Sequence, residues 1–226
     1  MQPLLLITGL VILAVVAGRG AWLRRRESRH LRELADRRRL NFAPDDLIGV
    51  YERYVHLDLI HRGHNRHVWN VLYGTTDAGL VTLFCYAYEL GFGTNRTQEQ
   101  WWMGVLETGD LHDTWQALPE EAIKRNYTKV GEVCVRTDRR TTRRSLEASE
   151  EIRSILDPAD RPCHWEVRGP LLAVAARLDS DPATAEQLLA RLVRLARGLA
   201  AVETSPIEGD GGTEGERDRE TERLRD

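Results

Sequence analysis

The chain has 226 residues, of which 42% are hydrophobic and 30% charged, and its formal net charge is −3. This length accommodates one domain of ordinary size with appendages, and the charged fraction indicates that part of the chain lies outside a packed core. The three cysteines, Cys85, Cys134 and Cys163, are far apart and lack a C-x-x-C spacing. They therefore argue against a disulfide framework and a zinc site, and we expect free, buried thiols in a reducing compartment.

An apolar segment opens the chain, because Pro3 to Gly18 carry no charge and the run reaches Leu23 if Arg19 snorkels. About 20 apolar residues cross a bilayer core, so we expect a transmembrane anchor over residues 1–23. A cleaved signal peptide is the alternative, but signal peptides carry their positive charge before the apolar run. Here the arginines follow it. The positive-inside rule then predicts a single-pass cell-membrane protein with an external N-terminus and a cytoplasmic C-terminal domain.

Residues 24–41 are predicted to form a basic juxtamembrane helix. Arginines near the anchor are candidates for contact with anionic lipid headgroups, each contributing about 1 kcal/mol, and a merely solvated helix is the alternative. These candidates are Arg24, Arg25, Arg26 and Arg29. A second short helix is expected after Pro44, with Asp45 or Asp46 as its cap and an apolar face that includes Leu47, Val50 and Tyr54.

Strand patterns dominate the next part of the chain. Residues 67–74, 80–90 and 98–108 are rich in aromatic and β-branched residues and are separated by turn sequences, which predicts an antiparallel meander. Residues 111–127 are ambiguous, with a short helix opening at Pro119 as one interpretation. Further strands are expected at 132–136, 163–168 and 171–178, and a helix at 145–156.

The last predicted helix begins after Asp181 and carries a wide apolar stripe that needs a partner surface. The sequence therefore predicts an α+β domain over residues 42–202, an antiparallel sheet of five to six strands with helices packed on one face. Residues 203–226 lose apolar periodicity and have the composition of a disordered acidic tail.

The chain resembles an uncharacterised group of small bacterial membrane-anchored proteins, a domain-of-unknown-function family. The residues that carry the resemblance are Asn70–Gly74, Phe84–Tyr88 and Gly91–Gly93, followed by the closing strand pair and amphipathic helix. The resemblance covers about residues 42–202. It implies an anchored cytoplasmic domain and transfers no catalytic residue; members of the group often have an acidic residue where this chain has Cys85.

Two basic clusters invite functional hypotheses. His56, His61, His64 and His67 have spacings that suit metal binding on a helix, but Gly63 and Asn65 interrupt a helix there, and a solvated basic connector is favoured. The second cluster follows Arg136 and could bind phosphate, lipid headgroups or a partner, although runs of charge are usually solvated. Its candidate residues are Arg139, Arg140, Arg143 and Arg144.

Signatures of catalysis are weak. Residues Gly91–Gly93 lack the third glycine and the following helix of a nucleotide loop, and indicate a hairpin turn instead. Glu107, Asp110, His112 and Asp113 bring acids and a histidine near one strand end without a recognisable geometry. We therefore expect a binding or scaffolding domain without a cofactor or metal, with a protein or anionic lipid as partner.

Two alternatives to that function differ in strength. One is an enzyme of unrecognised type, with a site near the 61–67 connector or near residues 107–113. The other is nucleic-acid binding through the arginine cluster, which the acidic balance and the lack of a known motif disfavour.

Overall fold

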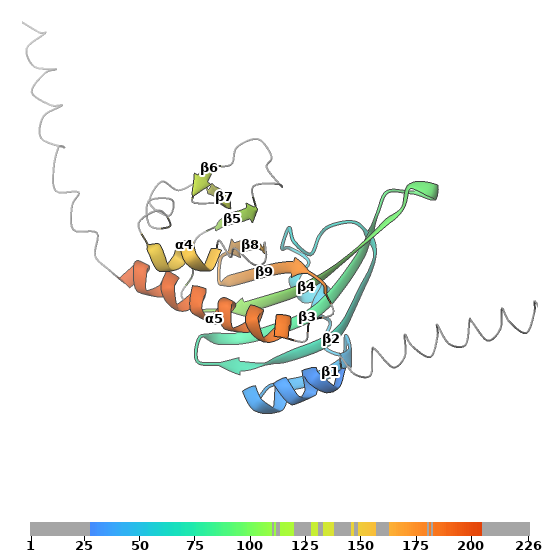
Figure 1. Ribbon diagram of the computed structural model, residues 1–226, viewed down its shortest axis with the longest axis horizontal. Coiled ribbons are helices and arrows are strands. Elements are labelled where there is room, and N and C mark those ends of the chain that lie inside the picture. Colours follow the sequence, from blue (N-terminus) through green and yellow to red (C-terminus); the bar gives the residue numbers. More distant parts are fainter. Residues whose placement is uncertain are drawn as a thin grey trace, which may run out of the picture.

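The computed structural model describes residues 28–109, 111, 114–119, 128–130, 133–137, 146, 149–156, 163–179, 181 and 183–204. These residues form one antiparallel sheet with the strand order β1-β2-β3-β4-β9-β8-β5-β7-β6. The chain leaves β4 and crosses to β5, and the β8–β9 hairpin later fills the space between them (Figure 1). Segments far apart in the sequence therefore lie side by side in the centre of the sheet.

The strands are β1 (Asn41–Asp45), β2 (His64–Thr76), β3 (Gly79–Leu90), β4 (Thr97–Glu107), β5 (Thr114–Pro119), β6 (Thr128–Val130), β7 (Val133–Thr137), β8 (Cys163–Arg168) and β9 (Leu171–Arg177). The helices are α2 (Val50–Tyr54), α4 (Glu150–Leu156) and α5 (Ala183–Thr204), with a 3₁₀ turn η1 (Gly93–Asn95) between β3 and β4. Residues 28–38 are also helical, and we refer to them as the N-terminal helix.

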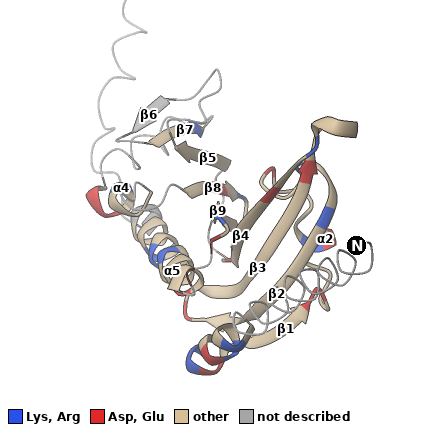
Figure 2. Ribbon diagram, turned by 45° about the vertical axis from the view of Figure 1, so that its right-hand side comes forward, with Lys and Arg blue, Asp and Glu red and all other residues tan. Residues whose placement is uncertain are grey.

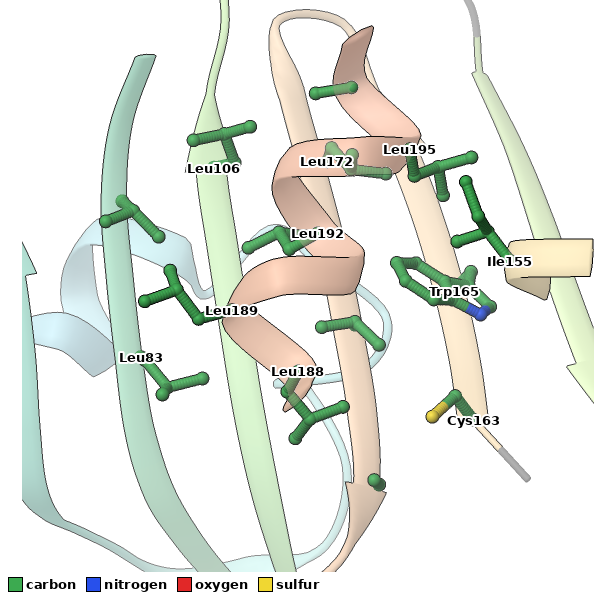
Figure 3. Packing of buried hydrophobic residues seen from close by; sticks show 14 of the residues in the cluster. Leu83, Leu106, Ile155, Cys163, Trp165, Leu172, Leu188, Leu189, Leu192 and Leu195 are labelled. Atoms are coloured by element: carbon green, nitrogen blue, oxygen red, sulfur yellow. The ribbon is translucent and has the colours of Figure 1, made fainter. Parts of the chain in front are cut away.

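One face of the sheet, which we call the helix face, lies under α5, α4 and the N-terminal helix. Figure 3 shows Leu188, Leu189, Leu192 and Leu195 of α5 above Leu172 and Trp165 of the strands. Gly104 lets α5 approach closely, because an added Cβ would lie 3.1–3.3 Å from side chains of Val174, Leu83 and Leu192. The N-terminal helix buries Leu31, Leu34 and Ala35 in the same core. This apolar contact is the main force that holds the helices on the sheet.

The opposite face is covered by residues 50–61, which comprise α2 and the turns after it. Val50, Tyr54, Leu57 and Ile60 are fully or almost fully buried there, against aromatic residues of β3 and β4. Gly49 occupies the helix N-cap position with φ of 66°, and the Asp46 carboxylate accepts a hydrogen bond from the Val50 N–H at 2.8 Å. The segment is short, so it leaves the outer part of this face to polar side chains.

The structure corrects the predicted fold in two respects. The sheet has nine strands among the described residues, rather than five to six, because β1, β5 and β6 were missed. Each of these strands is six residues or shorter, too short for a clear periodic pattern. Helices also lie on both faces rather than one, since α2 covers the face opposite α5. Leu47 lies outside α2 and is 75% exposed instead of lying on an apolar helix face.

The predicted membrane topology is also corrected. In the part of the chain that the structure describes, no helix has the length and apolar character needed to cross a membrane. The expected anchor over residues 1–23 lies outside the described residues, as do 205–226 of the predicted tail. The expectation of a single-pass membrane protein with an external N-terminus therefore lacks support.

Candidate functional site

A groove with a cavity volume of about 470 Å³ lies on the helix face, beyond the first residues of α5. We call it the aromatic–amide groove and define it by His67, Trp69, Asn70, Gln98 and Gln100, which line it from β2 and β4. Ala87 of β3 forms its floor, because β3 lies between the other two strands. The remaining lining residues are Ser28, Pro44, Asp45 and Leu178.

The two walls of the groove differ in chemistry. On β2, the rings of His67 and Trp69 are stacked, with centroids 5.4 Å apart and planes 14° from parallel. On β4, the exposed amides of Gln98 and Gln100 make no hydrogen bond to a described residue. His67 is opposite Ala87, which is opposite Gln100, so the small alanine leaves space between a ring and an amide. Such a groove offers one apolar surface and several free hydrogen-bonding groups to a ligand.

Two β-bulges in β2 place the aromatic wall. The register shifts between His64 and His67 and again between Trp69 and Leu72. At each bulge an asparagine has positive φ, 48° for Asn65 and 53° for Asn70, a conformation that asparagine tolerates better than most residues. Because each bulge reverses the alternation of side chains, Trp69 points to the same face as Leu72 and joins the helix-face core. Ser28 donates a hydrogen bond to the buried Asn70 Oδ1 at 3.2 Å.

A second polar cluster lies on the opposite face, beside a cavity of about 580 Å³. We call it the Asp58 clasp and define it by Asp58, Gln116, Arg136, Glu166 and Arg168. The Asp58 carboxylate accepts a hydrogen bond from Gln116 at 2.7 Å and lies 3.2 Å from Arg168 and 3.6 Å from Arg136. Gln116 in turn accepts a hydrogen bond from Arg136 at 2.9 Å. The polar groups of this cluster bind one another and hold the turn after α2 on the sheet.

Glu166 is the buried anchor of the clasp, with a side chain only 1% exposed. Its two carboxylate oxygens each accept a backbone N–H at 3.0 Å, from Asp58 and Leu59. Burial raises the pKa of the Glu166 carboxyl above its ordinary value, while these two N–H donors act in the opposite direction. The paired acceptors identify a structural role, because both oxygens are used to fix the turn.

A pair of rings, the buried Trp101 and the half-buried His164, lies near the clasp. His164 packs edge-on against Trp101 with centroids 5.0 Å apart, and Arg177 lies over the Trp101 ring. Burial lowers the pKa of His164 to about 4, and the nearby Arg62 charge adds to the effect. His164 Nδ1 and Trp101 Nε1 have no hydrogen-bond partner among the described residues. The half-buried His164 is therefore neutral in the native protein at neutral pH.

The histidines singled out in the sequence do not gather into one site. His64 Nε2 lies 2.7 Å from the Gly91 carbonyl oxygen, whereas His67 stacks on Trp69 in the groove. The backbone carbonyls of His56 and His61 accept hydrogen bonds from Arg168 and Arg66, and the His61 N–H donates to the Leu57 carbonyl at 3.0 Å. No three His, Cys, Asp or Glu side chains among the residues placed by the structure could hold a metal ion together.

The other sequence candidates are mostly structural or lie outside the described residues. Glu107 lies 2.7 Å from Arg53 and accepts a hydrogen bond from Tyr54 at 2.7 Å; burial raises the pKa of Tyr54 to about 12. Arg29 is exposed on the N-terminal helix. The candidates outside the described residues are Arg24, Arg25, Arg26, Asp110, His112, Asp113, Arg139, Arg140, Arg143 and Arg144.

Sequence reasoning missed both the groove and the clasp. A usable signal for the groove was the pair of glutamines at alternate positions at the start of β4, just before the buried residues 101–106. For the clasp it was Glu166, an acid between Trp165 and Val167 in a strand that is otherwise largely buried. An acid in such a position needs internal hydrogen-bond donors, which indicates a partner from elsewhere in the chain.

Comparison with known proteins informs the fold. No family model and no curated protein sequence matches the chain. Among solved structures, the chain is similar to the mycobacterial trehalose monomycolate transport factor A, TtfA. The match has a TM-score of 0.53 at 12% sequence identity and covers 83% of this chain and 98% of that one. The two chains share a fold over almost the whole of TtfA.

Proposed function

We propose that the chain is a non-catalytic binding or scaffolding domain that holds a partner protein through the aromatic–amide groove. The observation that carries the proposal is the contrast in how polar groups are used. Glu107, Glu166 and Asp58 are all engaged in internal contacts that fix the fold. Gln98 and Gln100 offer free amides beside an exposed ring. Free donors and acceptors next to an aromatic surface suit a peptide segment, whose backbone supplies complementary groups.

The fold similarity supports an accessory role. TtfA is a transport factor by name, and the match extends over 98% of its chain. By that analogy, we infer that this chain serves a transport process as an accessory factor that organises other components. The enzyme alternative is less well supported, because Glu107 and His64 are tied to neighbouring groups within the fold.

Site-specific photo-crosslinking in the native host tests the proposal. A photoreactive amino acid replaces Gln100 in the groove, and a matched control replaces Glu151, an exposed residue of α4. The expected result is a discrete protein adduct from position 100 that is absent from position 151. Because His67 faces position 100 across Ala87, the substitution His67→Lys should remove the adduct. The same adducts from both positions, or none from position 100, would contradict the proposal.

A further inference from the structure

The β3–β4 hairpin extends well beyond the end of β9 on one side and one residue beyond the end of β2 on the other. Pairing of β3 with β4 continues to Leu90 and Thr97, whereas β2 begins at His64, opposite Glu89, and β9 ends at Arg177, opposite Trp101. Residues Thr97 to Gln100 of β4 therefore pass the end of β9, a reach of about 13 Å at the usual rise per residue. Figure 1 shows the end of this hairpin projecting from the body of the domain.

The end of the hairpin, which we call the tip and define as residues 90–95, is apolar and exposed. Phe92 is 81% exposed and Leu90 is 43% exposed, and the only other exposed large hydrophobic residue among those described is Leu47. In Figure 2 the tip is tan, with charged residues only below it. Isolated exposed apolar residues are common, but two together on a projecting turn indicate a contact surface.

The tip has a defined conformation. The Phe92 ring stacks on His64 with centroids 4.8 Å apart, and the Asn95 N–H donates a hydrogen bond to the Phe92 carbonyl at 3.3 Å. Gly91 has φ of 76°, and an added Cβ would lie 2.3 Å from the Asn95 carbonyl oxygen, so the turn requires glycine there. The side chain of Phe92 is therefore presented outward by a fixed turn, which reduces the entropy lost on binding.

The base of the hairpin carries excess positive charge. It contains the arginines Arg62, Arg66, Arg96 and Arg177 and the glutamates Glu89 and Glu99. Arg96 lies 3.6 Å from Glu89, and Arg177 pairs with Glu99. Arg62 and Arg66 form no ion pair with a described carboxylate, although the Arg66 guanidinium donates hydrogen bonds to the Tyr51 hydroxyl at 2.7 Å and to the Arg62 carbonyl at 3.2 Å. The four arginines and two glutamates together give a net charge of +2 near the apolar tip.

We propose that the tip inserts Phe92 and Leu90 into the surface of an anionic lipid layer, with the net positive charge at its base close to the headgroups. A lipid surface suits the tip better than a protein pocket does. The tip is a narrow turn with two apolar side chains, whereas a stable protein interface buries about 800 Å² on each partner. An apolar projection with adjacent cations is the arrangement that binds anionic lipid surfaces. This inference is independent of the proposed function of the groove.

A fluorophore placed on the tip of the full-length protein tests the inference. The substitution Thr94→Cys supplies the attachment site, since Cys85, Cys134 and Cys163 are buried, and Gln187→Cys on α5 supplies a control site. Vesicles of phosphatidylcholine with phosphatidylglycerol should shift the emission of the probe at position 94 to shorter wavelength and leave position 187 unchanged. Vesicles of phosphatidylcholine alone should give a much smaller shift. Because each probe reports only its own surroundings, a shift at position 94 without one at position 187 assigns the lipid contact to the tip.

Matched substitutions identify the residues responsible. Phe92→Ser should weaken the vesicle-dependent shift by about tenfold or more in lipid concentration, since an apolar side chain of this size is lost from the lipid. Leu47→Ser removes a comparably exposed apolar residue elsewhere and should leave the shift unchanged. Arg62→Gln with Arg66→Gln should reduce the preference for phosphatidylglycerol. No shift at position 94, or equal effects of Phe92→Ser and Leu47→Ser, would overturn the inference.

Discussion

The Asp58 clasp and the aromatic–amide groove are both polar clusters on the sheet, but they use their polar groups in opposite ways. In the clasp, both oxygens of the buried Glu166 accept N–H groups, and Asp58 is surrounded by Gln116 and two arginines. In the groove, the side-chain amides of Gln98 and Gln100 make no hydrogen bond to a described residue. The comparison teaches that polar residues which hydrogen-bond to one another stabilise the fold. Polar side chains beside a cavity that make no such hydrogen bond are available for binding.

Removal of Glu166 should have the largest effect on stability. Glu166→Ala leaves the N–H groups of Asp58 and Leu59 without acceptors in a buried environment. We expect the free energy of unfolding to fall by about 3 kcal/mol, and by about half as much for Glu166→Gln, which keeps one acceptor oxygen. Urea denaturation followed by tryptophan fluorescence measures both. A change below about 0.5 kcal/mol for Glu166→Ala would show that the clasp is not structural.

His164 should make the protein less stable in mild acid. The unfolded chain binds a proton at the ordinary histidine pKa of about 6.5, whereas the native state binds it only near pH 4. Stability is therefore lost as the pH falls from 6.5 towards 4, by about 2 kcal/mol between pH 7 and pH 5. His164→Leu should remove this part of the pH dependence. Equal slopes of unfolding free energy against pH for the two proteins would contradict the assignment.

Asn70 should make an intermediate contribution to the unfolding free energy, through its backbone conformation. Its φ of 53° is unfavourable for alanine, so Asn70→Ala should lower the unfolding free energy by about 1 to 2 kcal/mol. Asn70→Gly tolerates positive φ and loses mainly the hydrogen bond from Ser28, so its cost should be smaller. Urea midpoints of the two variants give the comparison, and a glycine variant less stable than the alanine variant would argue against a conformational role.

Groove substitutions should have the smallest effect on stability. The side chains of His67 and Gln98 are exposed, and the Gln98 side-chain amide makes no hydrogen bond to a described residue. His67→Lys and Gln98→Lys should each change the unfolding free energy by no more than about 0.5 kcal/mol. We expect thermal and urea unfolding curves that nearly coincide with those of the unmodified protein. A fall in unfolding free energy as large as that caused by Glu166→Gln would assign the groove a structural role.

The sequence predicted the elements whose patterns are long and local. Residues 67–74 and 80–90 lie within β2 and β3, and the predicted strand 98–108 runs one residue past the end of β4. The helix after Asp181 is α5, with Asp181 Oδ1 accepting the Ala183 N–H at 2.9 Å. Other features depend on partners distant in sequence. The Glu166 carboxylate accepts hydrogen bonds from N–H groups of residues more than 100 positions earlier in the chain. The groove depends on bulges at Asn65 and Asn70, and a bulge changes the face of a strand without a clear mark in the sequence.

The most direct test of the division between clasp and groove measures both properties on the same two variants. The photoreactive residue at position 100 is combined with His67→Lys or with Glu166→Gln, and adduct yield and urea midpoint are determined for each. We predict that His67→Lys loses the adduct at an unchanged midpoint, and that Glu166→Gln lowers the midpoint but keeps the adduct under native conditions. An adduct that survives His67→Lys, or that changes only in parallel with stability, would contradict the account.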